Sequence, residues 1–460
     1  MSEREGSQRE RGATRAGRSE LARTDLSEER AQTRVAAVTG IGLVTPLGRK
    51  VEDVWDALCT GRSGLRTPPP DHVVAGYLDA AGIAPDIEAT EVLPPTETRA
   101  VDRSVLLALA AAHDAVADSG IRIGTDVDPE RVAVVVSTGG GGLESYEDFA
   151  AARRERGRPA VSPYLLPGML ANMAAARIAI AYGITGYSSS ISTACSSGAQ
   201  SIAEGLRLIR GGEADVVVCG GFDAPLHPTI AAAFANARAL ARNWDDPALA
   251  SRPFDRRRNG FVLAEGAAVV VVERTGTADA RGAAAYADLS GWGAATDAHH
   301  PTTPRPDGAG AAACMRRAIA DGGLAPSDVD YVNAHGTSTP LGDVAETTAI
   351  GAVFGDHRPA VSSIKAVTGH LLGGSGALEA VATALAVGRG LLPPTANLDD
   401  PDPRCDLDHV RGEPRAGALR AALTNSFAFG GHDVSLLLTP PSTRVTRAVP
   451  HPSPAGTTGH

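Results

Sequence analysis

One cysteine, two histidines and one lysine stand in segments rich in glycine, serine and threonine, where such side chains can do covalent chemistry. Cys195 comes first, and His335, Lys365 and His370 follow in two later segments. A thiolate can attack a thioester and hold the acyl group. Neutral imidazoles can donate hydrogen bonds to a developing enolate oxygen, and a lysine adds positive charge that tunes the site. The set therefore favours covalent acyl transfer.

Cys195 stands at a predicted elbow between a strand and a helix. The β-branched and small residues 191–193 predict a short strand, and apolar residues recur at helical spacing from Ile202 to Ile209. The free amide N–H groups and the positive dipole end of that helix favour a thiolate. A lone cysteine is more often a buried core residue, so the catalytic interpretation depends on the histidines.

Each histidine lies in a loop of small residues. His335 follows a buried-strand pattern at 329–333, and His370 lies in a second such loop. Taken singly, each is equally consistent with a satisfied polar group, but α/β proteins carry their sites on loops after strands. The helices predicted after these loops carry the carboxylates Asp343, Glu346 and Glu379.

The wider pattern is that of an α/β protein in which strands alternate with helices. Strands are predicted at 35–40, 132–136, 215–221, 261–263, 267–272, 285–291 and 329–333, and helices at 51–59, 99–119 and 309–321. The four glycines 139–142 match neither a Walker A nor a GxGxxG pattern. They predict a tight turn where another chain or a ligand approaches the backbone.

Composition and charge narrow the class of protein. The chain has 460 residues, 43% of them hydrophobic, which is enough for a large core. A net charge of −10 gives no support to nucleic-acid binding. Five cysteines without a CxxC pair, no membrane-length apolar run and no signal-peptide core predict a cytoplasmic protein without a membrane partner. Four arginines, Arg252, Arg256, Arg257 and Arg258, predict either a solvated surface or a docking patch.

The two ends of the chain differ in composition from the rest. Residues 1–33 are dense in Arg, Glu, Ser and Gly, and residues 441–460 are rich in Pro, Ser, Thr and Gly. Such segments bury too little apolar surface to offset chain entropy. Both are therefore predicted to be disordered.

Four motifs in order resemble those of the elongating 3-oxoacyl-(acyl-carrier-protein) synthases of the thiolase superfamily. The similarity extends from about residue 35 to 439. The motifs are Thr193–Gly198, Asn333–Thr339, Lys365 with Thr368–His370, and Asn425–Gly431.

The resemblance implies a fold and a reaction. The fold would be the α/β thiolase-like fold of five αβαβα layers, with two similar halves at 34–285 and 286–440, assembled as a dimer. Cys195 would accept the acyl chain from its carrier protein. His335 and His370 would promote decarboxylation of malonyl-carrier protein and stabilise the enolate, which then condenses with the Cys195 thioester.

The resemblance also implies roles for further residues. The N–H groups of Cys195 and Phe429 would form the oxyanion hole, and Phe429 would gate access. No metal or diffusible cofactor would be required, because phosphopantetheine arrives on the acyl carrier protein. Thr337, Thr339, Thr302 and Gly140 would contact the substrate or its pantetheine arm. Lys365, counted with the catalytic residues, and Glu379 would organise the electrostatics around the histidines, and Glu346 would support the site. Asp297 and Thr302 would lie in a loop that moves with the gate.

Two departures from the family pattern leave the substrate open. Gly140 replaces a bulky aliphatic residue that often limits the acyl pocket, and Ala428 and His432-Asp433 replace the more usual Gly and Thr-Asn. Chain elongation in fatty-acid or reducing polyketide assembly is consistent with the motifs, either as a homodimer for fatty acids or as a heterodimer with a chain-length factor. Remoter alternatives are a cysteine hydrolase or acyltransferase and a non-catalytic scaffold.

Overall fold

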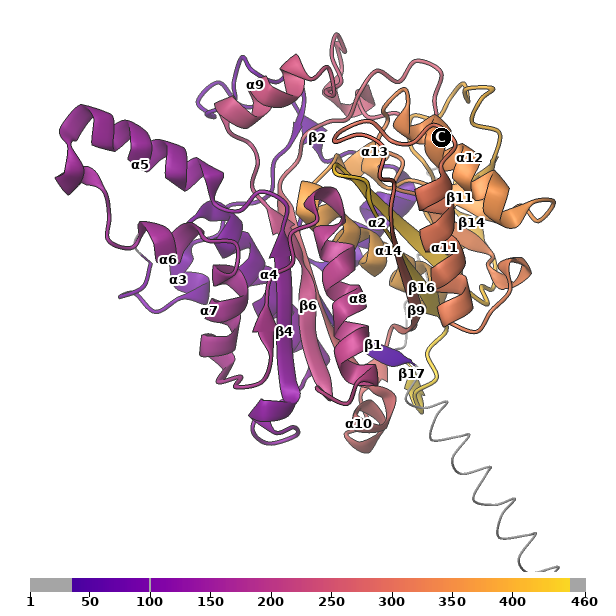
Figure 1. Cartoon of the computed structure of the whole chain (residues 1–460), viewed down its shortest axis with the longest axis horizontal. Helices are drawn as coiled ribbons and strands as arrows, with labels where there is room; N and C mark the ends of the chain where they lie inside the picture. Colours follow the sequence, from indigo (N-terminus) through magenta and orange to yellow (C-terminus); the bar gives the residue numbers. More distant parts are fainter. Residues whose placement is uncertain (1–34, 99–100, 447–460) are drawn as a thin grey trace, which may run out of the picture.

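The computed structural model describes residues 35–98 and 101–446, and there strands and helices alternate along most of the chain (Figure 1). The strands are β1 (Ala36–Val44), β2 (Leu65–Arg66), β3 (Ala81–Gly82), β4 (Val132–Thr138), β5 (Ser188–Ser189), β6 (Val216–Asp223), β7 (Gly266–Arg274), β8 (Ala284–Ala285), β9 (Ala287–Thr296), β10 (Tyr331–Asn333), β11 (Ala360–Ser362), β12 (Leu391–Leu392), β13 (Asp408–His409), β14 (Arg415–Ala416), β15 (Ala422–Ala428), β16 (His432–Thr439) and β17 (Val445–Thr446). The α-helices are α2 (Val51–Thr60), α3 (Ala89–Val92), α4 (Arg103–Ser119), α5 (Leu143–Arg156), α6 (Leu165–Met169), α7 (Met173–Tyr182), α8 (Ser197–Arg210), α9 (Pro228–Asn236), α10 (Thr275–Ala280), α11 (Ala309–Asp321), α12 (Gly342–Phe354), α13 (Lys365–Thr368) and α14 (Ser375–Arg389).

Eleven strands hydrogen-bond in the order β13-β11-β10-β15-β16-β9-β1-β7-β6-β4-β5. Strands β4, β6, β7 and β1 form one group and β9, β16, β15, β10 and β11 the other. The groups meet where the start of β1 pairs with β9, over 36–38. Each group mixes parallel and antiparallel pairs.

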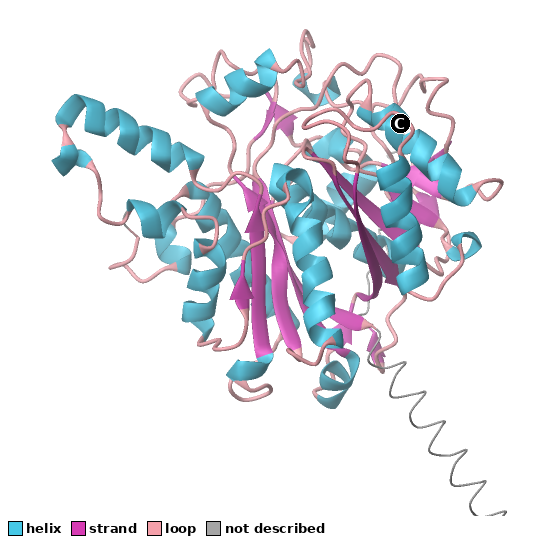
Figure 2. Cartoon of the chain, in the orientation of Figure 1, coloured by secondary structure: helices cyan, strands magenta, loops and turns pink. Residues whose placement is uncertain are grey.

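Helices lie between the two groups of strands and on both outer sides (Figure 2). Helix α4 packs on β1 and β7 from one outer side, and α11 packs on β9 and β16 from the other. Helices α8 and α14 occupy the middle, where α14 contacts both β7 and β15. Strands covered on both faces are apolar along most of their length, as β6 is over 216–222 and β7 over 266–272. The expected five-layered thiolase-like α/β arrangement is confirmed.

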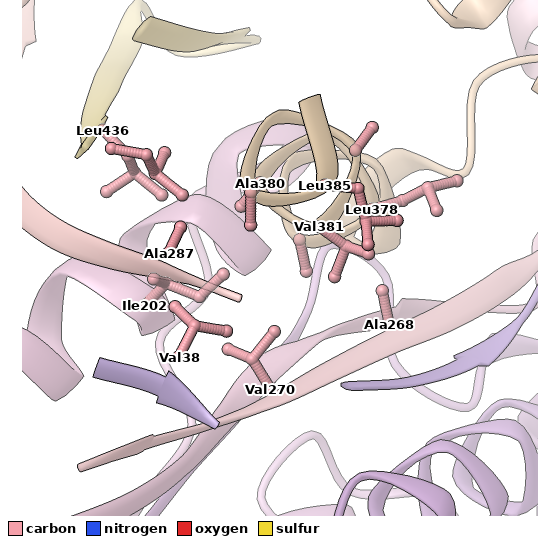
Figure 3. Close-up of a cluster of buried hydrophobic side chains, with 14 of the residues drawn as sticks. Val38, Ile202, Ala268, Val270, Ala287, Leu378, Ala380, Val381, Leu385 and Leu436 are labelled. Atoms are coloured by element: carbon pink, nitrogen blue, oxygen red, sulfur yellow. The ribbon is translucent and has the colours of Figure 1, made fainter. Parts of the chain in front are cut away.

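The middle layer is a tightly packed core (Figure 3). Ile202 of α8, Val270 of β7 and Leu436 of β16 belong to one buried cluster with the α14 side chains Leu378 and Val381. Alanines and glycines on α8 and α14 allow their backbones to approach closely, and a core at native density holds them rigidly. Both helices begin at the same end of the middle layer, so the loops that precede them are attached to a rigid core.

Some predicted elements differ in the structure. Residues 261–263 form only isolated bridges, to Leu240 and His370, and are therefore not a strand. The predicted strand at 191–193 is absent, because the Ile191 amide binds the hydroxyl of Ser137 at 2.8 Å in place of a neighbouring strand. The helix expected from residue 99 is seen from Arg103, after the N-cap Asp102.

The predictions for the chain ends fall largely outside the described residues. All of 1–33 and the segment 447–460 lie outside them. The prediction of disorder is wrong for 441–446, because β17 pairs with β8 and the Ser442 amide binds Asp288 at 2.9 Å. Within the described residues, no helix combines the length and the apolar character that a membrane span needs.

Candidate active site

Cys195 lies on a short 3₁₀ turn, Ala194–Ser196, that leads directly into α8. Ala194 has a φ of 50°, a left-handed conformation that makes the turn sharp. The Ser197 hydroxyl accepts the Thr193 amide at 2.9 Å and donates to the Ala194 carbonyl at 2.7 Å. The predicted elbow at the start of a helix is therefore present, fixed by small polar side chains.

Cys195 is not present as a thiolate, although the helix dipole by itself would favour one. Burial raises its pKa to about 11, although the charge of Lys365 acts in the opposite direction. Hydrogen bonds to the sulfur from the backbone N–H groups of Cys195 itself and of Phe429 also lower the pKa. Desolvation outweighs these effects, so the resting residue is a thiol.

The His335 loop is held at its backbone by Glu346 of α12. The two carboxyl oxygens of Glu346 accept the amide protons of His335 and Gly336, at 2.9 and 2.8 Å. The same carboxyl group accepts a hydrogen bond from the Asn425 side chain at 3.2 Å. Glu346 is 2% exposed, so these bonds lie in a low-dielectric interior. The helix carboxylate predicted to support the site thus positions the imidazole through the main chain.

Lys365 connects His335 to α14. Its Nζ atom donates to the His335 carbonyl at 2.8 Å, lies 3.4 Å from His335 Nδ1 and forms an ion pair with Glu379. Burial lowers the pKa of the lysine, while the neighbouring carboxylates, including Glu346, favour the ammonium form. Because an ammonium group only donates, His335 Nδ1 is an acceptor and Nε2 carries the proton.

His370 also has a partner at Nδ1, but this partner differs from that of His335. Its Nδ1 lies 2.8 Å from the hydroxyl of Ser375, the first residue of α14. That hydroxyl already accepts the Leu371 amide at 2.8 Å, so its own proton is available for His370 Nδ1. We therefore assign the proton of His370 to Nε2 as well. Ser375 is a positioning residue that sequence reasoning missed, although it stands at a predicted helix start.

The two imidazole rings lie close together and are neutral. Their centroids are 5.5 Å apart and their planes are nearly perpendicular. Burial holds the pKa of both well below the usual value, and the charge of Lys365 lowers both further. The site thus contains two uncharged imidazoles. Each carries its proton on Nε2, the nitrogen that does not contact Lys365 or Ser375.

Cys195 lies where two cavities meet. The larger has a volume of about 430 Å³ and contains both histidines beside the cysteine. The smaller, of about 220 Å³, continues past the sulfur on the side of Gly140 and helix α9. The predicted site residues Cys195, Asp297, Thr302, His335, Thr337, Thr339, Glu346, His370 and Phe429 all line the larger cavity, Gly140 lines the smaller, and Lys365 and Glu379 lie behind the histidines.

The glycine run beside Gly140 binds an internal carboxylate. The amides of Gly139 and Gly140 donate to Asp223 at 3.0 Å each, and the Gly373 amide donates at 2.6 Å. The predicted tight turn is present, and its occupant is Asp223 at the end of β6. Sequence reasoning missed this residue, for which the only signal was its place after a buried strand.

Aromatic rings cover the junction between the cavities. Phe429 is 38% exposed, and its ring centroid lies 6.3 Å from that of Phe234 on α9. Phe261 contacts both Phe234 and His370, at 5.2 and 5.3 Å. Sequence reasoning missed Phe234 and Phe261, because neither stands in a recognised motif.

The predicted basic cluster divides into two pairs. Arg252 and Arg258 are buried, and they bind Asp399 at 2.7 Å and Asp402 at 2.8 Å, so both predictions for them are wrong. Their guanidinium groups join internal loops instead of facing solvent or a partner. Only Arg256 and Arg257 have exposed side chains.

Comparison with known proteins agrees with this geometry. The N-terminal domain of the β-ketoacyl synthase family matches residues 33–278, and its C-terminal domain matches 286–399. The 3-oxoacyl-[acyl-carrier-protein] synthase 2 of Synechocystis is 43% identical over 401 residues, covering 87% of this chain and 96% of the relative. The Coxiella burnetii protein of the same name is 41% identical over 409 residues, 88% of this chain and 99% of the relative.

Solved structures give the same result. The ishigamide ketosynthase/chain length factor matches with a TM-score of 0.82 and 33% identity, covering 89% of this chain and 100% of that chain. A β-ketoacyl synthase from Burkholderia phymatum matches with a TM-score of 0.81 and 33% identity, covering 88% and 99%. A ketosynthase captured with its type II polyketide acyl-carrier protein matches at 0.82 and 29%, also covering 88% and 99%. The chain belongs to the β-ketoacyl synthase family.

Proposed function

We propose that this enzyme elongates acyl chains by decarboxylative condensation of an acyl group on Cys195 with malonyl-acyl carrier protein. The observation that carries the proposal is the meeting of one thiol and two neutral N–H-donating imidazoles in one cavity. A second cavity on the far side of the sulfur gives the bound acyl chain a place to lie. The names of the relatives support this substrate class.

In the first half-reaction the Cys195 sulfur attacks the carbonyl carbon of an acyl thioester. The N–H groups of Cys195 and Phe429, which already face the sulfur, stabilise the negative oxygen of the tetrahedral intermediate. The bond to the pantetheine sulfur breaks, and that sulfur leaves with the proton of the cysteine thiol. The acyl group then extends into the smaller cavity.

In the second half-reaction malonyl thioester occupies the larger cavity. Its carboxylate leaves as carbon dioxide, and the enolate oxygen accepts hydrogen bonds from Nε2 of His335 and His370. The enolate carbon attacks the Cys195 thioester, the carbon–sulfur bond breaks, and the Cys195 thiolate that leaves takes up a proton from solvent. The product is 3-oxoacyl-carrier protein.

The histidine tautomers argue against the hydrolase alternative. A cysteine hydrolase needs a base that accepts a proton from water. Here both Nδ1 atoms receive hydrogen bonds from protein groups, and both Nε2 atoms carry protons. The arrangement favours donation to an enolate over activation of water. We propose that the reaction needs no metal or diffusible cofactor, because these donors and the pantetheine thiol supply all the groups it uses.

We propose that the acyl carrier protein docks at the mouth of the larger cavity and that Arg238 contacts it. Arg238 lines this mouth and is exposed. Arg238→Glu should raise KM for malonyl-carrier protein roughly 3–10-fold with little change in kcat, because a rim charge acts on encounter with an acidic partner. Steady-state kinetics checks this, with the exposed Arg411→Glu as control. An equal rise in both variants would contradict a local docking role.

We propose a dimer that forms along β5. This strand is the outer edge of the main sheet and pairs only with β4 among the described strands. Exposed apolar side chains surround it, and α5 projects from the body on the same side (Figure 1). A partner would cover Leu143, Tyr146, Leu166, Leu170, Ile180 and Tyr187, of which Ile180 is 73% exposed. A second copy and a chain-length factor both fit this face.

The open wall at Gly140 favours a long or stiff acyl chain, as in a specialised polyketide pathway, over housekeeping fatty-acid elongation. A Cβ at Gly140 would meet Leu143 and Asp223 at 3.6 Å, which is ordinary contact. Gly140→Ile should therefore fold, fill part of the smaller cavity and shorten the products. Mass spectrometry of the released chains checks this, with Gly276→Ile, which faces open space, as control. An unchanged distribution of product lengths would contradict the proposal that the open wall at Gly140 allows long chains.

One experiment tests the proposed function directly. The protein is incubated with a panel of acyl-carrier proteins and malonyl-carrier protein, with and without a candidate chain-length factor, and intact masses are recorded. We expect acyl adducts on Cys195 and 3-oxoacyl products with two additional carbons. Acyl release to water without any need for malonyl-carrier protein would support the hydrolase instead. We also propose that the enzyme works in the cytoplasm, where its carrier protein is made.

A further inference from the structure

Two buried carboxyl groups lie against each other where the loop carrying Phe429 meets the loop after β9. Asp433 is 2% exposed and Asp297 is 8% exposed. Oxygens of both point at the α-carbon of Gly310 in the first turn of α11, into the space that a Cβ would fill. These oxygens, Asp297 Oδ1 and Asp433 Oδ2, flank a single point and face each other. Two carboxyl groups placed in this way form a hydrogen bond only if one of them carries a proton.

The proton belongs to Asp433. Asp297 Oδ2 already accepts the Arg305 amide at 2.9 Å. Asp433 Oδ2 is buried and receives no hydrogen bond from a donor group of the described residues. Burial, followed by the charge of Asp297, raises the pKa of Asp433 to about 8. Asp433 is therefore the donor at neutral pH.

The surrounding charged groups do not neutralise this pair. Within the described segments, neither carboxyl group forms an ion pair with an arginine, lysine or histidine: Arg305 pairs with Asp307, and the Arg317 guanidinium binds the Ala294 carbonyl. The nearby carboxylate of Glu346 on α12 also raises the pKa of Asp433. The titratable and charged groups around Asp433 are Asp297 and Arg305 of the loop after β9, Cys314 and Arg317 of α11, Glu346 of α12 and His432 of β16.

The pair lies beside two backbone hydrogen bonds that join the same loops. The Asp297 amide donates to the Gly431 carbonyl at 3.0 Å, and the Gly430 amide donates to the Pro301 carbonyl at 2.7 Å. Between these links and Cys195 stands Phe429, whose amide faces the cysteine sulfur. The carboxyl pair is thus a third link between the loops, and it is the only one of the three that a change of pH can break.

We propose that Asp433 is a positioning residue whose carboxyl proton, shared with Asp297, fastens the loop 297–305 to the Phe429 loop and so holds the Phe429 amide at Cys195. The catalytic consequence rests on the proposed function, but the link itself does not. Loss of the proton leaves two adjacent buried carboxylates, which repel strongly where water is excluded. The loops are therefore joined below about pH 8 and separate above it.

Alkylation of Cys195 by iodoacetamide measures this directly. Asp433→Asn keeps a permanent donor of nearly the same shape, so its link persists at high pH. Release of the Phe429 amide also changes thiol ionisation, so each rate is divided by the thiolate fraction measured by ultraviolet absorbance, and the ratio of wild-type to variant rates then reports the access that the loops allow. We expect a ratio near 1 at pH 6.5 that rises about tenfold by pH 9.5, the scale of one hydrogen bond to a charged group. A ratio that stays constant with pH would overturn the proposal.

Two further variants sharpen the test. Asp297→Asn should also remove the rise, because its amide can donate to an ionised Asp433. Asp307→Asn, in the same loop but exposed and paired with Arg305, should keep the rise of the wild type. Loss of the rise in Asp307→Asn would instead indicate a general loop effect and overturn the proposal. Condensation should fall above pH 8 in the wild type but not in Asp433→Asn. Absence of condensation in all variants would contradict the proposed function and leave the alkylation result standing.

Discussion

Cys195→Ala is expected to abolish chain elongation while malonyl-carrier protein is still decarboxylated. Without the sulfur, no acyl group can be held between the two cavities, and elongation should fall by about 10⁴-fold or more, the scale seen when a covalent nucleophile is removed. The imidazole N–H groups that stabilise the enolate are held by Lys365 and Ser375, neither of which the substitution touches. Mass spectrometry of elongated product and of acetyl-carrier protein separates the two steps.

The matched control is Cys219→Ala. Cys219 is fully buried in β6, and burial raises its pKa far above the usual value, so it has no route to substrate. That variant should elongate chains close to the wild-type rate, with some loss of stability from the lost sulfur. Elongation by Cys195→Ala at a comparable rate would refute covalent catalysis at this residue.

Lys365→Met should be the most destabilising single change at the site. It leaves Glu379, 1% exposed, without its cation and removes the donor to the His335 carbonyl. Breaking a buried ion pair from one side costs about 3–5 kcal/mol, because the remaining charge stays desolvated. The loss is measured as a lower midpoint of chemical denaturation. Decarboxylation should fall too, because His335 Nδ1 loses the partner that fixes its tautomer.

A double variant separates the structural from the catalytic effect. Lys365→Met combined with Glu379→Leu replaces the ion pair with apolar side chains and should regain most of the stability, but not the activity. Arg122→Met, which breaks an exposed pair with Asp126, should leave the denaturation midpoint nearly unchanged, because solvent screens that pair. Recovery of full activity in the double variant would show that Lys365 acts only on stability.

The local patterns predicted the elements that position the site because each depends on neighbours along the chain. Glycine and serine at the Cys195 elbow, alternating strands and helices, and carboxylates on the helices after the histidine loops are signals of this kind. The prediction of a strand at 261–263 was wrong because a strand depends on a hydrogen-bonded partner elsewhere in the chain. These residues form only isolated bridges.

The charge states of side chains and the burial of charged groups were the properties that the sequence predicted least well. The helix dipole favoured a thiolate at Cys195, but burial has the larger effect and raises its pKa. The charges of Arg252 and Arg258 favoured the surface, but carboxylates from distant segments allow both to be buried. In each case the deciding groups come from parts of the chain far away in sequence.

The amino-acid sequence alone determined which side chains are candidates for the chemistry and which of them lie at turns and helix starts, because these features depend on residue type and short-range spacing. Only the tertiary structure decided the protonation states of those groups, the second cavity behind Cys195 and the contact between Asp297 and Asp433. The physical reason is that desolvation and charge pairing depend on distances in space, and residues more than a hundred positions apart meet only when the two groups of strands close around α8 and α14.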